Sequence, residues 1–165
     1  MQSYKVLNKQ IFKSGVFSIV PIRFEDRIDI MNWRNEQMYH LRQDKPLTEK
    51  SQDDYFNGTV AKLFDQEKPN QILFSYLKNG NCIGYGGLVH INWIDKNAEI
   101  SFIMNTDLEE DHFHFHWSTY LKMIESLAFE ELSFHKLYVY AFDLRPHLYK
   151  VLLDSNYFRD AILKD

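Results

Sequence analysis

Glu99 and Ser101 stand two residues apart in the stretch AEISFIM, which is rich in β-forming residues. Successive side chains of a strand point to opposite faces, so these two would project from the same face. A carboxylate held on such a face is suited to accept a proton as a general base. The alternative is an ordinary solvated carboxylate near the start of a strand, and the sequence leaves both interpretations open because it does not show burial.

A second group of polar side chains occupies residues 143–149, in the segment DLRPHLY. Asp143, Arg145, His147 and Tyr149 follow a β-rich run, and ligand sites of α/β proteins favour the ends of strands. Tyr149 or His147 could therefore take part in proton transfer. The segment is equally typical of a strand-to-helix turn with ordinary capping side chains.

The elements that must position these residues follow from periodicity and turn residues. Asn79-Gly80 joins two β-rich runs and is a strong hairpin signal. Asp26 and Thr48 are candidate helix N-caps, and Pro146 suits the first turn of a helix. We predict strands at 17–23, 71–78, 81–93, 98–105 and 136–142, a short strand from Tyr157, and helices at 26–36, 48–64, 112–130 and 146–155. This order predicts an α+β fold with a mixed sheet.

Composition limits the classes of protein that this chain can be. Its 165 residues suit one domain, residues 1–165, and 45% are apolar, which excludes a disordered chain. The formal net charge is −4, with no basic excess that would indicate nucleic acid. Cys82 is the only cysteine, and no apolar run approaches the roughly 18 residues that span a bilayer. With no signal peptide at the N-terminus, we expect a cytoplasmic protein that binds neither nucleic acid nor a membrane.

Four motifs, in their order and spacing, are similar to those of the GCN5-related N-acetyltransferase (GNAT) superfamily. They are WRNE (33–36) with PLT (46–48), IGYGGL (83–88), AEISFIM (98–104) and SNYF (155–158). Within the superfamily, the ribosomal-protein and nucleotide-sugar amine N-acetyltransferases look closest. The three glycines of IGYGGL also indicate a close backbone approach or a bulge. The likeness covers the chain from Phe17 to Phe158.

The resemblance implies a GNAT-like sheet that is mixed but largely antiparallel, flanked by helices, and splayed between its fourth and fifth strands. It also implies that a neutral amine attacks the thioester carbonyl of acetyl-CoA, the co-substrate. That reaction needs a base for the ammonium proton and a donor for the departing thiolate. For these roles we expect Glu99 as base and Tyr149 as acid, since Leu153 occupies the family's usual tyrosine position.

The same resemblance implies that CoA lies along the splayed strand, with its phosphates at the start of the next helix. The expected cofactor contacts are Phe102, Ile103, Met104, Phe115, His116 and Trp117, and the expected acceptor contacts are Trp33, Tyr39, His40, Ser101 and His147. Core packing is the alternative for Trp33. In the family's phosphate loop, glycines allow close approach, but here Phe113 and Phe115 hold those positions after an acidic stretch at 107–111. We therefore expect modest, salt-sensitive affinity for CoA.

His112, His114 and His116 alternate with aromatic residues, a pattern that raises the possibility of a metal site. On a strand all three would share a face, and on a helix only His112 and His116 would. No cysteine or fourth ligand is near, so we expect no metal. The segment is expected to open a helix, with imidazoles and free N–H groups facing phosphate or solvent.

Together these features predict an acetyl-CoA-dependent N-acetyltransferase that acts on a primary amine of a small molecule, such as a nucleotide-linked amino sugar, and forms a homodimer. Two alternatives stay open: acetylation of a protein N-terminus, and a degenerate member that binds a ligand without catalysis. The acidic, glycine-free loop favours the degenerate member. The intact AEISFIM strand and the polar DLRPHLY segment favour catalysis.

Overall fold

A computed structural model describes residues 1–141 and 145–163 of the chain. Its strands are β1 (Phe12–Ser14), β2 (Phe17–Pro21), β3 (Ile72–Lys78), β4 (Asn81–Asn92), β5 (Asn97–Met104) and β6 (Lys136–Tyr138). Its α-helices are α1 (Arg27–Glu36), α2 (Glu49–Tyr55), α3 (Ala61–Leu63), α4 (Phe113–Glu125) and α5 (Pro146–Asp154). Short 3₁₀ turns lie at Phe24–Asp26, Met38–His40 and Thr106–Leu108.

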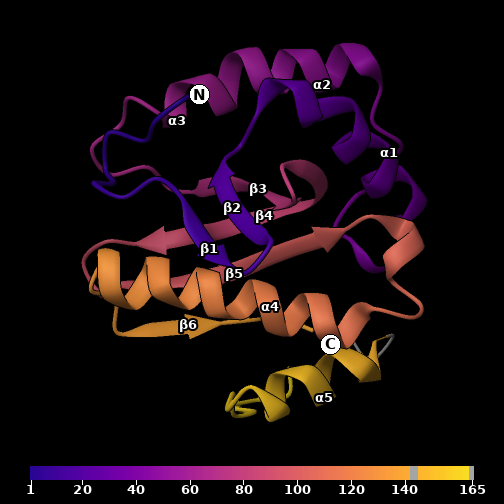
Figure 1. Cartoon of the computed structure of the whole chain (residues 1–165), viewed down its shortest axis with the longest axis vertical. Coiled ribbons are helices and arrows are strands. Elements are labelled where there is room, and N and C mark those ends of the chain that lie inside the picture. Colours follow the sequence, from indigo (N-terminus) through magenta and orange to yellow (C-terminus); the bar gives the residue numbers. More distant parts are fainter. Residues whose placement is uncertain (142–144, 164–165) are drawn as a thin grey trace.

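The strands form one six-stranded sheet in the order β1-β2-β3-β4-β5-β6. Neighbouring strands from β1 to β5 are antiparallel, and β6 is parallel to β5. Figure 1 shows α1, α2 and α3 on one side of the sheet and α4 with α5 on the other. The predicted mixed, largely antiparallel sheet with flanking helices is therefore confirmed. No helix in the described part of the chain is long and apolar enough to cross a membrane.

Local sequence signals explain several element boundaries. Asn79 and Gly80 both have positive φ, 50° and 81°, as the predicted two-residue hairpin requires. The Thr48 side chain accepts a hydrogen bond from the backbone N–H of Ser51, whose own side chain bonds back to Thr48, so α2 begins with a capping box. Asp26 precedes α1 but does not cap it, because its carboxylate accepts hydrogen bonds from the Arg23 guanidinium at 2.7 and 2.9 Å.

The two longer predicted helices contain irregular turns. The helix predicted at 48–64 is present, but π-helical residues Phe56–Val60 separate α2 from α3. The helix predicted at 112–130 is also present, and its last part, Ser126–Glu131, is π-helical. Buried residues continue through both π-helical stretches, with Phe56 and Val60 in the first and Leu127 and Ala128 in the second.

The strand predictions were less accurate at the two ends of the chain. The sequence did not reveal β1, which pairs only three residues with β2 and is too short to show alternation. The strand predicted at 136–142 pairs only to Tyr138, and its last predicted residue, Phe142, lies outside the described residues. The strand predicted from Tyr157 is wrong: residues 157–163 are not a strand, and the Tyr157 N–H instead donates to the Leu152 carbonyl, closing α5.

Helix α4 packs directly onto β5. The Phe102 ring stacks on the Tyr120 ring with centroids 4.0 Å apart, and Trp117 meets Phe102 edge to face. A Cβ at Gly86 would collide with the Ser101 carbonyl and with the Tyr120 hydroxyl. The close backbone approach predicted for these glycines is therefore confirmed, and it sets how near α4 lies to the sheet.

Strand β6 pairs with only the first part of β5. The parallel register runs from Asn97↔Lys136 to Glu99↔Tyr138, whereas β5 continues to Met104. The second half of β5 thus has a neighbour on the β4 side only, within the described residues. The expected splay of the two strands stays a prediction, and this short register supports it.

Candidate active site

Glu99 lies where β6 stops pairing with β5, and its side chain is only 10% exposed. Two basic side chains cover its carboxylate. His90 Nδ1 lies 2.8 Å from Oε2, and the Arg42 guanidinium lies 3.4 Å from Oε1. The His90 and Arg42 side chains are 63% and 57% exposed, so the carboxylate is reached from solvent past these two groups.

Aromatic side chains at the end of β6 complete this surface. The Arg42 guanidinium lies over the Tyr140 ring, 5.3 Å from its centroid. Burial, followed by the nearby charge of Glu99, raises the pKa of Tyr138. Ser101 follows Glu99 on the same face and is half-buried. The face of β5 that carries Glu99 is therefore polar and charged, as a site for proton transfer requires.

The expected cofactor residues of β5 alternate between the two faces of the sheet. Phe102 and Met104 are buried on the α4 side, where Phe102 joins the aromatic cluster around Tyr120. Ile103 is buried and stands directly opposite Tyr85 of β4. The side chains of all three are core, so only their backbone groups are available to a ligand beside the strand.

The start of α4 differs from what the sequence suggested. His116 is buried, with Nδ1 2.9 Å from the Tyr76 hydroxyl, and its backbone N–H donates to His112 within the helix. Trp117 is also buried in the core, whereas Phe115 is half exposed and packs on Phe17. Because His116 and Trp117 lie past the first turn, their backbone N–H groups are used within the helix, and the free backbone donors of a helix belong to its first residues.

The three alternating histidines diverge. His114 Nε2 lies 3.0 Å from the Asp154 carboxylate on α5, and His116 points into the core. Burial lowers the pKa of His116 to about 4, and the neighbouring His112 and Lys78 act in the same direction. Over residues 1–141 and 145–163, no group of three or more His, Cys, Asp or Glu side chains could hold a metal ion.

The expected acceptor residues on α1 and the following turn are divided between core and surface. Trp33 is buried in the hydrophobic core, which was the alternative considered for it. Tyr39 is 66% exposed and its ring meets that of His40 edge to face, at 4.8 Å. His40 is buried, so Tyr39 is the member of this group that a solute can contact.

His40 belongs to a buried charged cluster with Arg145 and Glu109. The Arg145 guanidinium lies 3.2 Å from His40 Nδ1 and donates to the Glu109 carboxylate at 3.0 Å. Burial lowers the pKa of His40 to about 4, and the charge of Arg145 adds to this effect. Burial also raises the pKa of Glu109, although Arg145 opposes that shift. This cluster ties the start of α5 to the acidic turn before α4.

The remaining predicted residues lie on α5. His147 is exposed and its ring packs on Phe113, with centroids 4.3 Å apart. The Tyr149 hydroxyl donates a hydrogen bond to the Ala141 carbonyl at 3.1 Å. To act as an acid, the hydroxyl would have to donate to the thiolate in place of this carbonyl. Asp143, the first member of the predicted polar group, lies outside the described residues.

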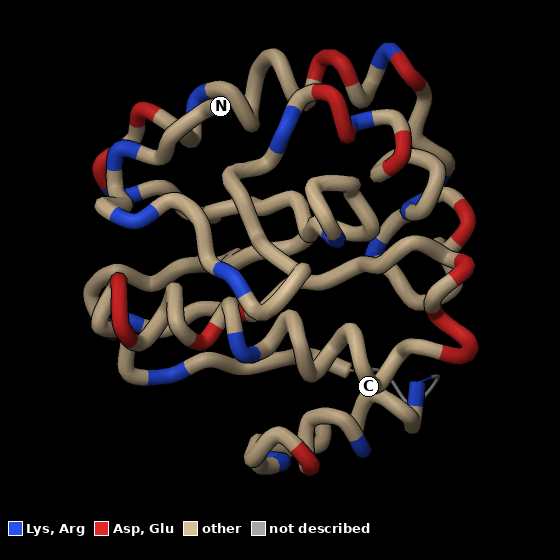
Figure 2. Tube along the Cα trace, viewed as in Figure 1, with Lys and Arg blue, Asp and Glu red and all other residues tan. Residues whose placement is uncertain are grey.

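Sequence reasoning missed Arg42, His90 and Glu109. The feature of the sequence that could have drawn attention to His90 is a polar residue near the end of an apolar strand. Its contact with Glu99 could not be predicted, because that contact depends on an irregularity of the backbone between Val89 and Asn92. Figure 2 shows acidic residues gathered along the turn between β5 and α4, which includes Glu109. The acidic stretch itself was visible in the sequence, but its buried partner Arg145 was not.

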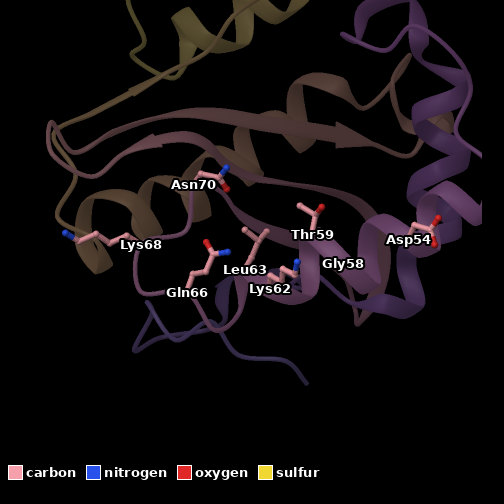
Figure 3. A pocket seen from close by; sticks show the side chains of 8 residues that line it. All are labelled: Asp54, Gly58, Thr59, Lys62, Leu63, Gln66, Lys68 and Asn70. Atoms are coloured by element: carbon pink, nitrogen blue, oxygen red, sulfur yellow. The ribbon is translucent and has the colours of Figure 1, made fainter.

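A hollow of about 520 Å³ lies elsewhere, beside α2, α3 and the loop that leads to β3 (Figure 3). Its lining residues are Asp54, Gly58, Thr59, Lys62, Leu63, Gln66, Lys68 and Asn70. None of the residues predicted for chemistry lines it. The polar cluster around Glu99 is therefore the better candidate for the active site.

Comparison with known families identifies the class of protein. A family model described as an acetyltransferase (GNAT) domain matches residues 19–146. The match covers most of the chain, and the chain belongs to the GNAT acetyltransferase family. It is an acetyl-CoA-dependent N-acetyltransferase. Among curated protein sequences, none matches the chain significantly.

Solved structures with the same fold include spermidine N-acetyltransferases of Vibrio cholerae. One, in complex with CoA and spermine, has a TM-score of 0.78 and 17% identity, and the match covers 91% of this chain and 85% of that chain. A dodecameric structure in an intermediate state has a TM-score of 0.72 and 17% identity, with coverage of 91% and 84%. The finer resemblance to nucleotide-sugar and ribosomal-protein members stays a prediction.

Proposed function

We propose that the chain transfers the acetyl group of acetyl-CoA to a primary amine of a small molecule, with Glu99 at the centre of proton transfer. The observation that carries this proposal is the buried Glu99 carboxylate at the point where β6 leaves β5. A thioester lying along the unpaired half of β5 would bring its carbonyl close to this carboxylate. A negative charge there favours an incoming ammonium and promotes the removal of its proton.

The backbone supports a CoA site next to Glu99. The pantetheine arm would pair with backbone groups of residues 102–104, which lack a β6 neighbour in the described part of the chain. The pyrophosphate would lie at the first turn of α4, where N–H groups and the helix dipole favour an anion. The acidic stretch 107–111 repels the pyrophosphate. Because salt screens this repulsion, we expect the affinity for CoA to depend on salt concentration.

A polyamine is the first acceptor class to test. The spermidine N-acetyltransferase that shares this fold was solved with CoA and spermine. The exposed carboxylates of Asp107, Glu110 and Asp111 give the neighbouring turn a negative field, which favours a polycation.

A nucleotide-linked amino sugar is the second acceptor class, and one observation favours it. Arg42 places an exposed guanidinium 3.4 Å from the Glu99 carboxylate. A guanidinium binds phosphate oxygens in a bidentate manner. It would hold the nucleotide while the sugar amine meets Glu99.

A thiol-release assay with acetyl-CoA, followed by mass spectrometry of the products, tests the proposal. The amines are spermidine, spermine, amino sugars linked to nucleotides, and a peptide with a free N-terminus. We expect turnover with a small-molecule amine and a loss of about 10²-fold in Glu99→Gln. Turnover with the peptide alone would favour an N-terminal acetyltransferase, and CoA binding without any turnover would favour a degenerate binding protein. Light scattering of the same sample tests the expected homodimer against a larger assembly.

A further inference from the structure

We propose that His90, rather than Glu99 itself, takes the proton from the acceptor ammonium, and that Glu99 acts through it as a positioning residue. This inference rests on the proposed function and deepens it by naming the group that touches the amine. Three observations carry the inference: the order of the two side chains from solvent inward, the backbone at His90, and the second partner of Glu99.

The imidazole of His90 stands between Glu99 and solvent. The Nδ1–Oε2 distance is 2.8 Å, with the His90 side chain 63% exposed and the Glu99 side chain 10% exposed. An ionised carboxylate only accepts hydrogen bonds, so Nδ1 is the donor, and in the neutral imidazole the lone pair then lies on Nε2. Among the described residues, no hydrogen-bond partner contacts Nε2. A neutral imidazole with an open Nε2 and a carboxylate behind Nδ1 is the arrangement of a general base with its orienting group.

The backbone is distorted where it brings these two groups together. Val89 is paired directly with Glu99, so regular alternation would place His90 on the opposite face of the sheet. The β4–β5 register shifts between Val89 and Asn92, and His90 has a φ of 49°. This left-handed conformation is uncommon outside glycine, although asparagine, aspartate and histidine adopt it more often than other residues. Bulges next to active sites re-aim side chains in this way, and here the bulge turns His90 onto Glu99.

Arg42 accounts for the second carboxylate oxygen. Its guanidinium lies 3.4 Å from Oε1, so neither oxygen of Glu99 faces solvent without a basic neighbour. An ammonium arriving at this surface meets His90 first and would have to displace one of the two to reach the carboxylate. The charge of Glu99 is then used to stabilise the imidazolium that forms.

The proposed step conserves atoms and electrons. Nε2 of His90 removes one proton from the acceptor R–NH₃⁺, and the freed nitrogen lone pair forms a bond to the thioester carbonyl carbon. The carbon–sulfur bond breaks, and its electron pair leaves with the CoA sulfur. The nitrogen loses its second proton and the thiolate gains one, so the products are the N-acetylated amine and CoA thiol. His90 then releases its proton to solvent.

Two substitutions keep the unusual backbone and remove the base. Asparagine and glycine both accept a positive φ, so His90→Asn and His90→Gly should fold. We expect kcat to fall about 10²-fold in each, with the KM for acetyl-CoA unchanged. We also expect added imidazole to raise the kcat of His90→Gly at least about tenfold, because the space left by the His90 side chain is open to solvent. His135→Ala, an exposed histidine before β6, is the matched control and should keep full activity.

The outcomes separate the inference from the function on which it rests. Loss of rate in His90→Asn together with imidazole rescue of His90→Gly supports the inference. Full activity in His90→Asn while Glu99→Gln is inactive overturns it, because Glu99 then works alone, and the proposed function stands. A loss of rate in folded His90→Gly that imidazole does not restore also overturns it. If the wild-type protein acetylates none of the amines, the proposed function fails independently of any variant.

Discussion

The hydroxyl of Tyr120 on α4 donates a hydrogen bond to the carbonyl oxygen of Ser101 on β5, at 2.7 Å. The bond passes over Gly86 of β4, where a Cβ would strike both partners. It ties the helix that would bind CoA phosphates to the strand that carries Glu99.

Gly86→Ala is therefore expected to be strongly destabilising. The added methyl group must push apart a backbone carbonyl and a buried tyrosine, and overpacking of this kind costs about 1–3 kcal/mol or more. Urea unfolding measures the change in free energy. Gly58→Ala is the control, because a Cβ there meets no atom within 4 Å and the change should be neutral or stabilise by about 0.4–1 kcal/mol. Equal stability of the two variants would show that α4 adjusts freely.

Tyr149→Phe should reduce kcat about tenfold or more while leaving the KM for acetyl-CoA nearly unchanged, if its hydroxyl protonates the departing thiolate. The phenyl ring keeps its packing, but the hydrogen bond to the Ala141 carbonyl is lost. Steady-state kinetics and thermal unfolding should be measured together. A lower melting temperature with full activity would assign the hydroxyl to structure alone, and the thiolate would then leave to water.

Neutralising the acidic turn should tighten CoA binding. Glu110 and Asp111 are exposed just before the first turn of α4, where they repel a pyrophosphate. We expect the double variant Glu110→Gln, Asp111→Asn to lower the Kd for CoA about two- to fivefold at low salt. We also expect its Kd for CoA to differ less between low and high salt than that of the wild type. Calorimetry at two salt concentrations measures both effects. Asp65→Asn, at an exposed site after α3, is the control. Weaker CoA binding by the double variant would argue against phosphates at this helix start.

Stability should fall as the pH drops from about 6.5 to about 4. Burial lowers the pKa of both His40 and His116 to about 4, while an unfolded histidine titrates near 6.5. Between these values the unfolded chain binds more protons, so the free energy of unfolding decreases with falling pH. Glu109, whose pKa is raised by burial, opposes part of this loss.

The variant His116→Gln tests the assignment of that slope. Urea unfolding at several pH values should show an uptake of about one proton fewer on unfolding between pH 6 and 4.5 than in the wild type. His135→Gln, at an exposed site, should leave the slope unchanged. A slope unaltered by His116→Gln would mean that this histidine is protonated in the folded protein as readily as in the unfolded one.

Much of the fold was determined by local sequence signals. The Asn79-Gly80 hairpin, the Thr48 cap and Pro146 at the start of α5 each depend on residues within a few positions of one another. Such signals act through backbone sterics and short-range hydrogen bonds, so they can be recognised without the rest of the chain. The element order they define was enough to predict the mixed sheet and the position of Glu99 on a strand.

The partners of Glu99 were decided by the tertiary structure alone. His90 reaches it only because the β4–β5 register shifts, and Arg42 arrives from a turn 57 residues earlier in the chain. The same holds for His116, whose position at the start of a helix suggested a phosphate contact but whose ring lies against Tyr76 in the core. Periodicity specifies which face a side chain occupies within one element. It does not specify the register between neighbouring strands, the position of bulges or the distance between elements. These features of the tertiary structure determine which charged groups meet at the site.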